Sequence, residues 1–334
     1  MCLADIEEGQ PEDSPQTVGL PRDLDLPFFA YGIFRSREVA WPRIANFVIS
    51  HSISIIDEWV IRLRNGLPVL VAQDGGSVEG DCVEFSNPET AYKVIGNSEP
   101  DGEYRWNTIS TRSGQRCNVL VAEKPNRGVS DEPISRWTSA QDPTFVHGMA
   151  FVAGSVAEVR DGLLVNKPWS DSPEDWDAFF RLQGAFLVLW SIVERLAAFR
   201  FGAEYVPSGK GKNTTAKIYA LAEVSEFRAA VDKAMIKPLS VYSVRENRSK
   251  KTRKDENYVD NAKIDPASVL KTWYQVRSNI THRGKSAKSD NAMVLTATID
   301  LFNVTYHYLE AVIDGLDREW SRRDLLPIPQ IDKN

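Results

Sequence analysis

An arginine and a histidine stand five positions apart in the run Arg277-Ser278-Asn279-Ile280-Thr281-His282. A guanidinium can hold a phosphate group, and an imidazole can take up or release a proton near neutral pH. The run closes a segment whose apolar spacing predicts an amphipathic helix, from Asp265-Pro266 to about Thr281. On a straight helix the two side chains point roughly 140° apart. Gly284 indicates that the helix ends near His282, which lets the histidine leave the helix axis.

The C-terminal half of the chain, residues 166–330, has the pattern of a helical bundle. A long helix is predicted from Ser172-Pro173-Glu174-Asp175, where a capping serine precedes a first-turn proline and acids, to a stop at Gly202. A second helix is predicted over residues 215–233. The last starts at Ser289-Asp290 and continues through Ile313.

The N-terminal half has shorter signals. Apolar runs at residues 27–32, 67–72 and 118–122 are separated by Gly, Pro, Asn and Asp clusters, which predicts strands of a compact sheet or barrel with one or two helices. The stretch 44–64 fits strand or helix equally well. Residues 1–25 are acidic and poor in large apolar side chains, and we expect a flexible tail there.

Composition favours a cytoplasmic, soluble protein of two domains. The chain has 334 residues, 42% of them hydrophobic and 26% charged. Its three cysteines, Cys2, Cys82 and Cys117, lack the spacing of a zinc site or a disulfide scaffold and fit a reducing compartment. The start is acidic, unlike a signal peptide, and the most apolar run, 185–193, is about half of what a membrane span needs.

Charge is distributed unevenly. Residues 1–150 carry 13 Lys and Arg against 22 Asp and Glu, and residues 151–334 carry 27 against 24. Clustered basic side chains suit a nucleic-acid backbone, although such a run is equally often a solvated loop. The candidate RNA contacts are Arg248, Lys250, Lys251, Arg253, Lys254, Arg283 and Lys285.

The order of long helix, basic insertion, helix with Arg-x4-His and closing helix resembles the HEPN superfamily. That resemblance implies a metal-independent endoribonuclease without cofactors that acts as a homodimer on RNA. His282 would be the base or acid, Arg277 would stabilise the phosphate, and Ser278 or Asn279 would orient the substrate. Many such domains in bacteria act as toxins or antiviral effectors, which implies a regulatory partner or antitoxin.

Glu194 lies in an apolar stretch and needs a partner, because an unpaired buried carboxylate is costly. We expect Arg277 to be that partner. The alternative is that Glu194 lies at the edge of the apolar stripe and pairs with solvent or Arg195.

Two ordered segments resemble the γ-glutamylcyclotransferase-like proteins, over about residues 26–125. The first is the run from Phe28 to Arg35, and the second is Glu99 followed by the strand that begins at Tyr104. The resemblance implies a small mixed β-barrel over residues 26–160, with Glu99 as the proton-transfer residue in release of 5-oxoproline from a γ-glutamyl compound. The implied substrate-binding residues are Tyr31, Gly32, Ile33, Phe34 and Tyr104.

The sequence therefore predicts an α+β protein of two domains. Three functions stay open: a regulated HEPN ribonuclease with a sensing or modifying barrel, a true γ-glutamylcyclotransferase with a helical dimerisation domain, and a non-catalytic interaction protein.

Overall fold

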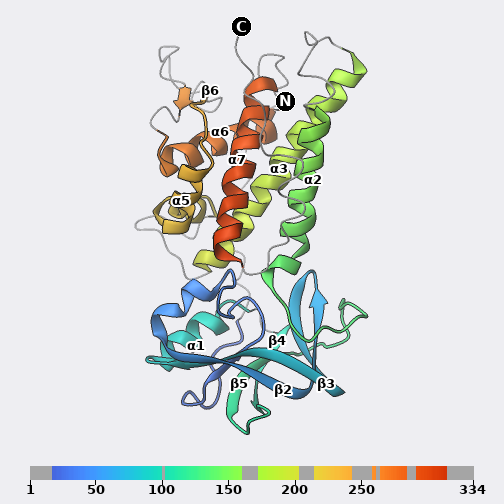
Figure 1. The fold of residues 1–334 in the computed structure, drawn as a ribbon, viewed down its shortest axis with the longest axis vertical. Coiled ribbons are helices and arrows are strands. Elements are labelled where there is room, and N and C mark those ends of the chain that lie inside the picture. Colours follow the sequence, from blue (N-terminus) through green and yellow to red (C-terminus); the bar gives the residue numbers. More distant parts are fainter. Residues whose placement is uncertain are drawn as a thin grey trace, which may run out of the picture. The chain divides into compact units, whose positions relative to one another are not determined.

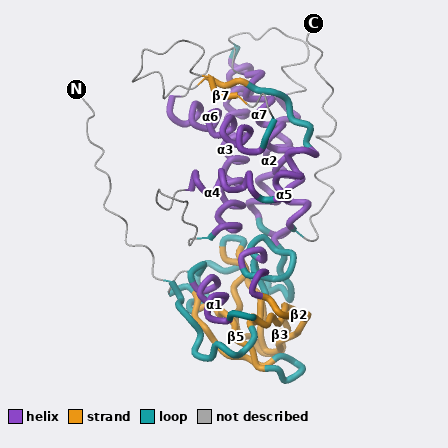
Figure 2. Tube along the Cα trace, turned by 90° about the vertical axis from the view of Figure 1, so that its left-hand side faces the viewer, coloured by secondary structure: helices purple, strands orange, loops and turns teal. Residues whose placement is uncertain are grey.

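The computed structural model describes residues 17–99, 102–159, 172–202, 214–242, 258–260, 264–283 and 291–313, with the backbone alone at residues 214, 242, 258–260, 282, 283 and 291. The chain divides into two compact units. Of the described residues, unit 1 comprises 17–36, 42–99, 102–137 and 202, and unit 2 comprises the others. The protein is mixed α/β, as the sequence predicted, with the sheet in unit 1 and the long helices in unit 2 (Figures 1 and 2).

Unit 1 is built on a five-stranded sheet in the order β2-β3-β1-β5-β4. The strands are β1 (Phe28–Ala30), β2 (Val48–Arg64), β3 (Leu67–Phe85), β4 (Tyr104–Ser110) and β5 (Arg116–Ala122). The ambiguous stretch 44–64 is thus mainly strand. Asn65 and Gly66, both with positive φ, form the tight turn that joins β2 to β3.

The described residues form an open sheet, not the predicted barrel. β2 and β4 are its edges. Arg112, just after β4, donates its backbone N–H to the Ile55 carbonyl of β2 at 2.7 Å, so the sheet curls toward closure. A barrel needs a continuous ladder between the edges, and this contact does not make one.

Side chains that alternate along β1 pack on opposite faces of the sheet. Phe28 contacts the rings of Tyr92 and Trp106 edge-on, on the face that α1 (Pro88–Gly96) covers. Phe29 is fully buried in the cluster on the other face, with Ile56, Leu70, Val119 and Trp137 among its members. The short β1 is therefore held between two cores.

Residues 17–25, predicted as part of the tail, are hydrogen-bonded to the rest of unit 1. Trp106 Nε1 donates to the Gly19 carbonyl at 2.9 Å, and Asn118 Nδ2 donates to the Asp23 carbonyl at 2.6 Å. Residues 1–16 lie outside the described part of the chain.

Unit 2 is mainly helical. Its helices are α2 (Pro143–Val159), α3 (Pro173–Phe201), α4 (Thr214–Ala220), α5 (Ser225–Lys233), α6 (Pro266–Arg283) and α7 (Asn291–Val312), and β6 (Ser240–Tyr242) pairs with β7 (Tyr258–Asp260). α2 and α7 both pack along α3 (Figure 1). The boundary between the units falls at Trp137–Thr138, earlier than the predicted position near residue 160, because α2 belongs with the helices.

The single helix predicted over residues 215–233 is interrupted. A 3-10 turn, Leu221–Glu223, and the extended Val224 separate α4 from α5. Ile218 and Phe227 are both buried but stand nine positions apart, which puts them on opposite sides of a straight helix. The break turns both toward the interior.

One described helix, α3, is long and apolar enough to cross a membrane by length and composition alone. The tested window is 56% buried inside the fold, as in the core helix of a soluble protein. The structure is therefore compatible with a soluble protein.

Candidate active site

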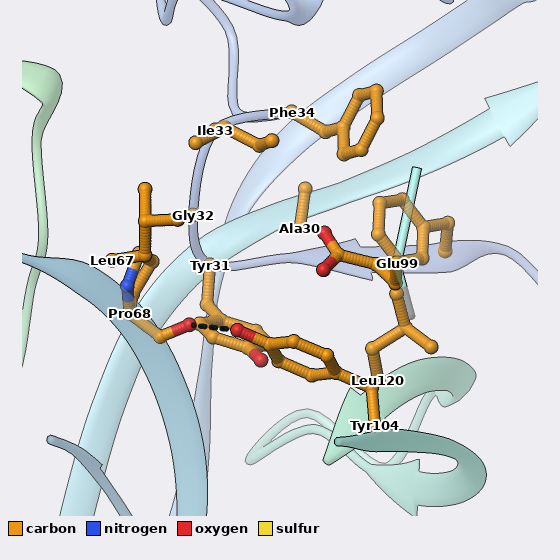
Figure 3. A pocket seen from close by; sticks show the side chains of 11 residues that line it. Ala30, Tyr31, Gly32, Ile33, Phe34, Leu67, Pro68, Glu99, Tyr104 and Leu120 are labelled. Atoms are coloured by element: carbon orange, nitrogen blue, oxygen red, sulfur yellow. Dashed lines mark hydrogen bonds between the residues drawn. The ribbon is translucent and has the colours of Figure 1, made fainter. Parts of the chain in front are cut away.

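A pocket that is open to solvent lies in unit 1 beside the end of β1 (Figure 3). Its lining comes from five separate segments, and its walls are largely hydrocarbon. The lining residues are Phe28, Ala30, Tyr31, Gly32, Ile33, Phe34, Leu67, Pro68, Glu99, Tyr104 and Leu120.

The turn after β1 forms one wall of this pocket. Arg35 donates its backbone N–H to the Gly32 carbonyl at 2.9 Å, which closes a four-residue turn over residues 32–35. Glycine is needed at position 32, because a Cβ there would lie 2.7 Å from Pro68 Cγ. The turn consequently lies directly against the start of β3.

Buried polar groups fix the far end of the turn. Ser36 donates its backbone N–H to the carboxylate of Asp81 at 2.7 Å. The buried Arg35 guanidinium donates to the Trp137 carbonyl at 3.1 Å and pairs with Glu79 at 3.3 Å. These contacts tie the turn to β3, so its backbone is held in place before any ligand binds.

The two central backbone N–H groups of the turn, at Ile33 and Phe34, take part in no hydrogen bond within the described residues. Both residues line the pocket. Two adjacent N–H groups of this kind can donate hydrogen bonds to a carboxylate or a developing oxyanion.

Glu99 stands where the chain leaves α1. Its backbone N–H donates to the Gly96 carbonyl at 3.3 Å, and its carbonyl accepts from Val18 N–H at 3.3 Å. Gly96 admits no side chain, because a Cβ would lie 2.1 Å from the Gly19 carbonyl oxygen. The segment around Val18 therefore packs against the end of α1 and holds Glu99 at the pocket wall.

The Glu99 carboxyl group points into the pocket (Figure 3). Burial raises its pKa from 4.5 to about 8, and the positive charge of Arg43 limits the rise. Arg43 lies over the Phe34 ring, with its guanidinium carbon 5.5 Å from the ring centre. A carboxyl group with this pKa exchanges a proton readily near neutral pH.

Two tyrosines complete the polar lining. Tyr104 donates its hydroxyl to the Pro68 carbonyl at 3.4 Å, as Figure 3 shows. Burial, and then the charge of Glu99, raise the pKa of Tyr31 and of Tyr104 well above the usual value. Both side chains stay protonated and can donate hydrogen bonds at physiological pH.

The structure brings six residues singled out from the sequence into this one pocket: Tyr31, Gly32, Ile33, Phe34, Glu99 and Tyr104. Sequence reasoning missed the apolar lining from Phe28, Ala30, Leu67, Pro68 and Leu120, and also the nearby Arg43. The apolar residues carry no chemical group that would mark them in the sequence as part of a site. The turn at Asn65-Gly66, which starts β3 at Leu67, was the nearest available signal.

The predicted site of unit 2 is described only in part. Arg277 is half-buried on α6, whereas Ser278 is buried and Asn279 accepts a hydrogen bond from Gln275 at 2.8 Å. The roles of Ser278 and Asn279 in orienting a substrate stay predictions. The side chains of His282 and Arg283 lie outside the described part, as do Arg248, Lys250, Lys251, Arg253, Lys254 and Lys285, so their roles stay predictions.

The predicted ion pair between Glu194 and Arg277 is not formed. Glu194 accepts a hydrogen bond from Trp190 Nε1 at 2.8 Å, and the described residues show no ion pair at Arg277. Arg195 pairs with Asp142 at 2.6 Å. An indole one turn earlier on the same helix satisfies the carboxylate without removing a second charge from water.

Within the described ranges, no three His, Cys, Asp or Glu side chains are grouped so that they could hold a metal ion. Comparison of the chain with protein-family models, with curated proteins and with solved structures gives no match.

Proposed function

We propose that unit 1 acts on a γ-glutamyl compound and releases 5-oxoproline, with Glu99 as the proton-transfer residue. The observation that carries the proposal is the Glu99 carboxyl group in an apolar pocket, with a pKa of about 8. The resemblance to γ-glutamylcyclotransferase-like proteins supplies the reaction. The pocket supplies a base, protonated tyrosines and unoccupied backbone donors.

The reaction is an attack of the substrate's α-amine on its own γ-carbonyl carbon. The attacking nitrogen is the neutral α-amine, and a carboxylate with a pKa of about 8 is a stronger base for its proton than an ordinary glutamate with a pKa of 4.5. Glu99 takes the proton as the new C–N bond forms. It then returns the proton to the leaving nitrogen as the old C–N bond breaks.

The remaining polar groups bind and orient the substrate in this proposal. The N–H groups of Ile33 and Phe34 would donate to the α-carboxylate, and the Tyr104 hydroxyl would leave the Pro68 carbonyl and donate to the γ-carbonyl oxygen.

The test is release of 5-oxoproline from γ-glutamyl amides and glutathione by wild type and Glu99→Gln. The variant should lose at least about 100-fold in kcat/KM. Glu89→Gln, an exposed acid on α1, is the matched control and should keep full activity. The wild-type kcat/KM should fall as the pH drops below about 8, because protonation of Glu99 removes the base. An active Glu99→Gln variant would refute the role of Glu99.

We further propose, as a second candidate, that unit 2 is a HEPN-type ribonuclease that cleaves RNA as a homodimer. In this proposal the protein acts in the cytoplasm as a toxin or an antiviral effector. One observation favours it: Arg277 is half-buried yet has no ion-pair partner among the described side chains. In this proposal the Arg277 guanidinium binds a phosphate of the RNA.

RNA integrity and growth after expression test this candidate independently of unit 1. Arg277→Ala and His282→Ala should each abolish RNA breakage, whereas Arg228→Ala, an exposed arginine on α5, should not. Breakage that persists in both variants rejects the ribonuclease. If wild type shows neither 5-oxoproline release nor RNA breakage, a non-catalytic interaction protein is favoured.

A further inference from the structure

Two cysteines on different strands meet in the core of unit 1. Cys82 of β3 and Cys117 of β5 are free thiols with exposed fractions of 2% and 0%. Their sulfur atoms lie 3.1 Å apart. A disulfide has an S–S distance of about 2.05 Å, so the sulfurs need to approach by about 1 Å to bond.

An exposed residue, Gln115, contacts both thiols of this pair. Gln115 is exposed, in the turn between β4 and β5. Its side-chain Oε1 accepts a hydrogen bond from Cys82 Sγ at 3.3 Å, and its carbonyl oxygen lies 3.9 Å from Cys117 Sγ. The turn is closed by backbone hydrogen bonds between Thr111 and neighbouring residues. Local opening of this short turn would move Gln115 away from both sulfurs.

The two thiols are not equivalent. The hydrogen bond from Cys117 lowers the pKa of Cys82, and the same bond raises the pKa of Cys117. Cys82 is therefore the thiol that ionises first and is the stronger candidate nucleophile.

We propose that Cys82 and Cys117 are an oxidation site, at which a small peroxide converts the two thiols into an intramolecular disulfide. The Cys82 thiolate attacks one oxygen of hydrogen peroxide and releases hydroxide, which leaves a sulfenic acid. Cys117 then attacks that sulfur, and water leaves. In total two thiols and one peroxide give one disulfide and two waters, with the sulfurs oxidised by two electrons and the peroxide reduced by two.

The bond would join the two strands that flank β1. Phe29 pairs with Cys82, and Phe28 pairs with Asn118, the neighbour of Cys117. The cross-link would restrict the unfolded chain over the whole segment from Cys82 to Cys117, which raises the resistance of unit 1 to denaturant. This inference does not depend on the proposed function.

The test uses the full chain with Cys2→Ser, so that Cys82 and Cys117 are its remaining thiols. Hydrogen peroxide should remove both thiols together, with a mass loss of two hydrogens and a peptide linked through Cys82 and Cys117. A higher urea midpoint, reversed by a reductant, should accompany it. Gln115→Gly should oxidise several-fold faster because the cover is removed.

A second variant separates the pair from ordinary thiol oxidation. With Cys117→Ser, Cys82 should gain one or more oxygens and form no intramolecular link. The proposal is overturned if the protein with both thiols gains oxygen at Cys82 without cross-linking, or if both thiols survive peroxide even in the Gln115→Gly background.

Discussion

Replacing Glu99 with glutamine should stabilise unit 1, and the gain should grow with pH. The substitution keeps the shape of the side chain but removes its charge. Each tenfold change in proton affinity corresponds to about 1.4 kcal/mol. A pKa raised from 4.5 to about 8 therefore costs the folded protein at most about 5 kcal/mol when the carboxyl group is ionised. Because Glu99 is partly exposed at an open pocket, we expect about 2–4 kcal/mol.

The sign of the stability difference follows from the upward shift of the Glu99 pKa. Below pH 4.5 the carboxyl group is protonated in both the folded and the unfolded chain, so wild type and Glu99→Gln should be about equally stable. Between pH 4.5 and 8 the unfolded chain ionises first, and wild type loses stability. Above pH 8 the difference should be constant, with the variant the more stable protein.

Urea unfolding at pH 4, 6, 7.5 and 9 measures the difference, and comparison at each pH cancels other titrating groups. Glu89→Gln is the control, because an exposed carboxylate should show no comparable trend. Titration of ¹³C-labelled glutamate carboxyl groups, with the Glu99 signal assigned by its loss in the variant, measures the pKa directly. A stability difference that does not change with pH, or a titration near pH 4.5, would refute the burial argument.

Three other substitutions test the packing. Gly96→Ala should destabilise unit 1 by about 1–3 kcal/mol in urea unfolding, because the new Cβ meets the Gly19 carbonyl. It should also lower the activity, because Glu99 is held less firmly. Gly184→Ala, in α3 with nothing within 4 Å of the new Cβ, should instead stabilise unit 2 by about 0.5–1 kcal/mol. Asp142→Ala should destabilise unit 2 by about 3–5 kcal/mol because it leaves Arg195 without its buried partner, and a neutral result in thermal unfolding would contradict that pairing.

The ends of two long helices were predictable because local chemistry sets them. Ser172 Oγ accepts from Asp175 N–H at 3.2 Å at the start of α3, and Gly202 at its end has φ +65°. Asp265 caps α6 by accepting from Ser268 N–H at 3.1 Å. Such signals involve residues within one turn, so the sequence alone contains them.

The errors in unit 2 concern packing across the fold. α2 was missed although Phe145, Met149, Val152 and Val156 have helical spacing and are all buried. The break at Val224 depends on where the neighbouring helices pack against this segment. The spacing of apolar residues within the segment does not show that position.

The same distinction applies to the pocket. A family resemblance placed Glu99 near Tyr31 and Tyr104, but the proton affinity of Glu99 depends on contacts that the resemblance does not contain. The chain must pass Gly96 against Gly19 to aim the carboxyl group inward, and side chains from four other segments must surround it. The resemblance indicates which residue would move a proton in the proposed reaction. Whether Glu99 is protonated at pH 7 depends on its burial in the folded pocket, so the Glu99 pKa is the quantity on which the proposed chemistry depends.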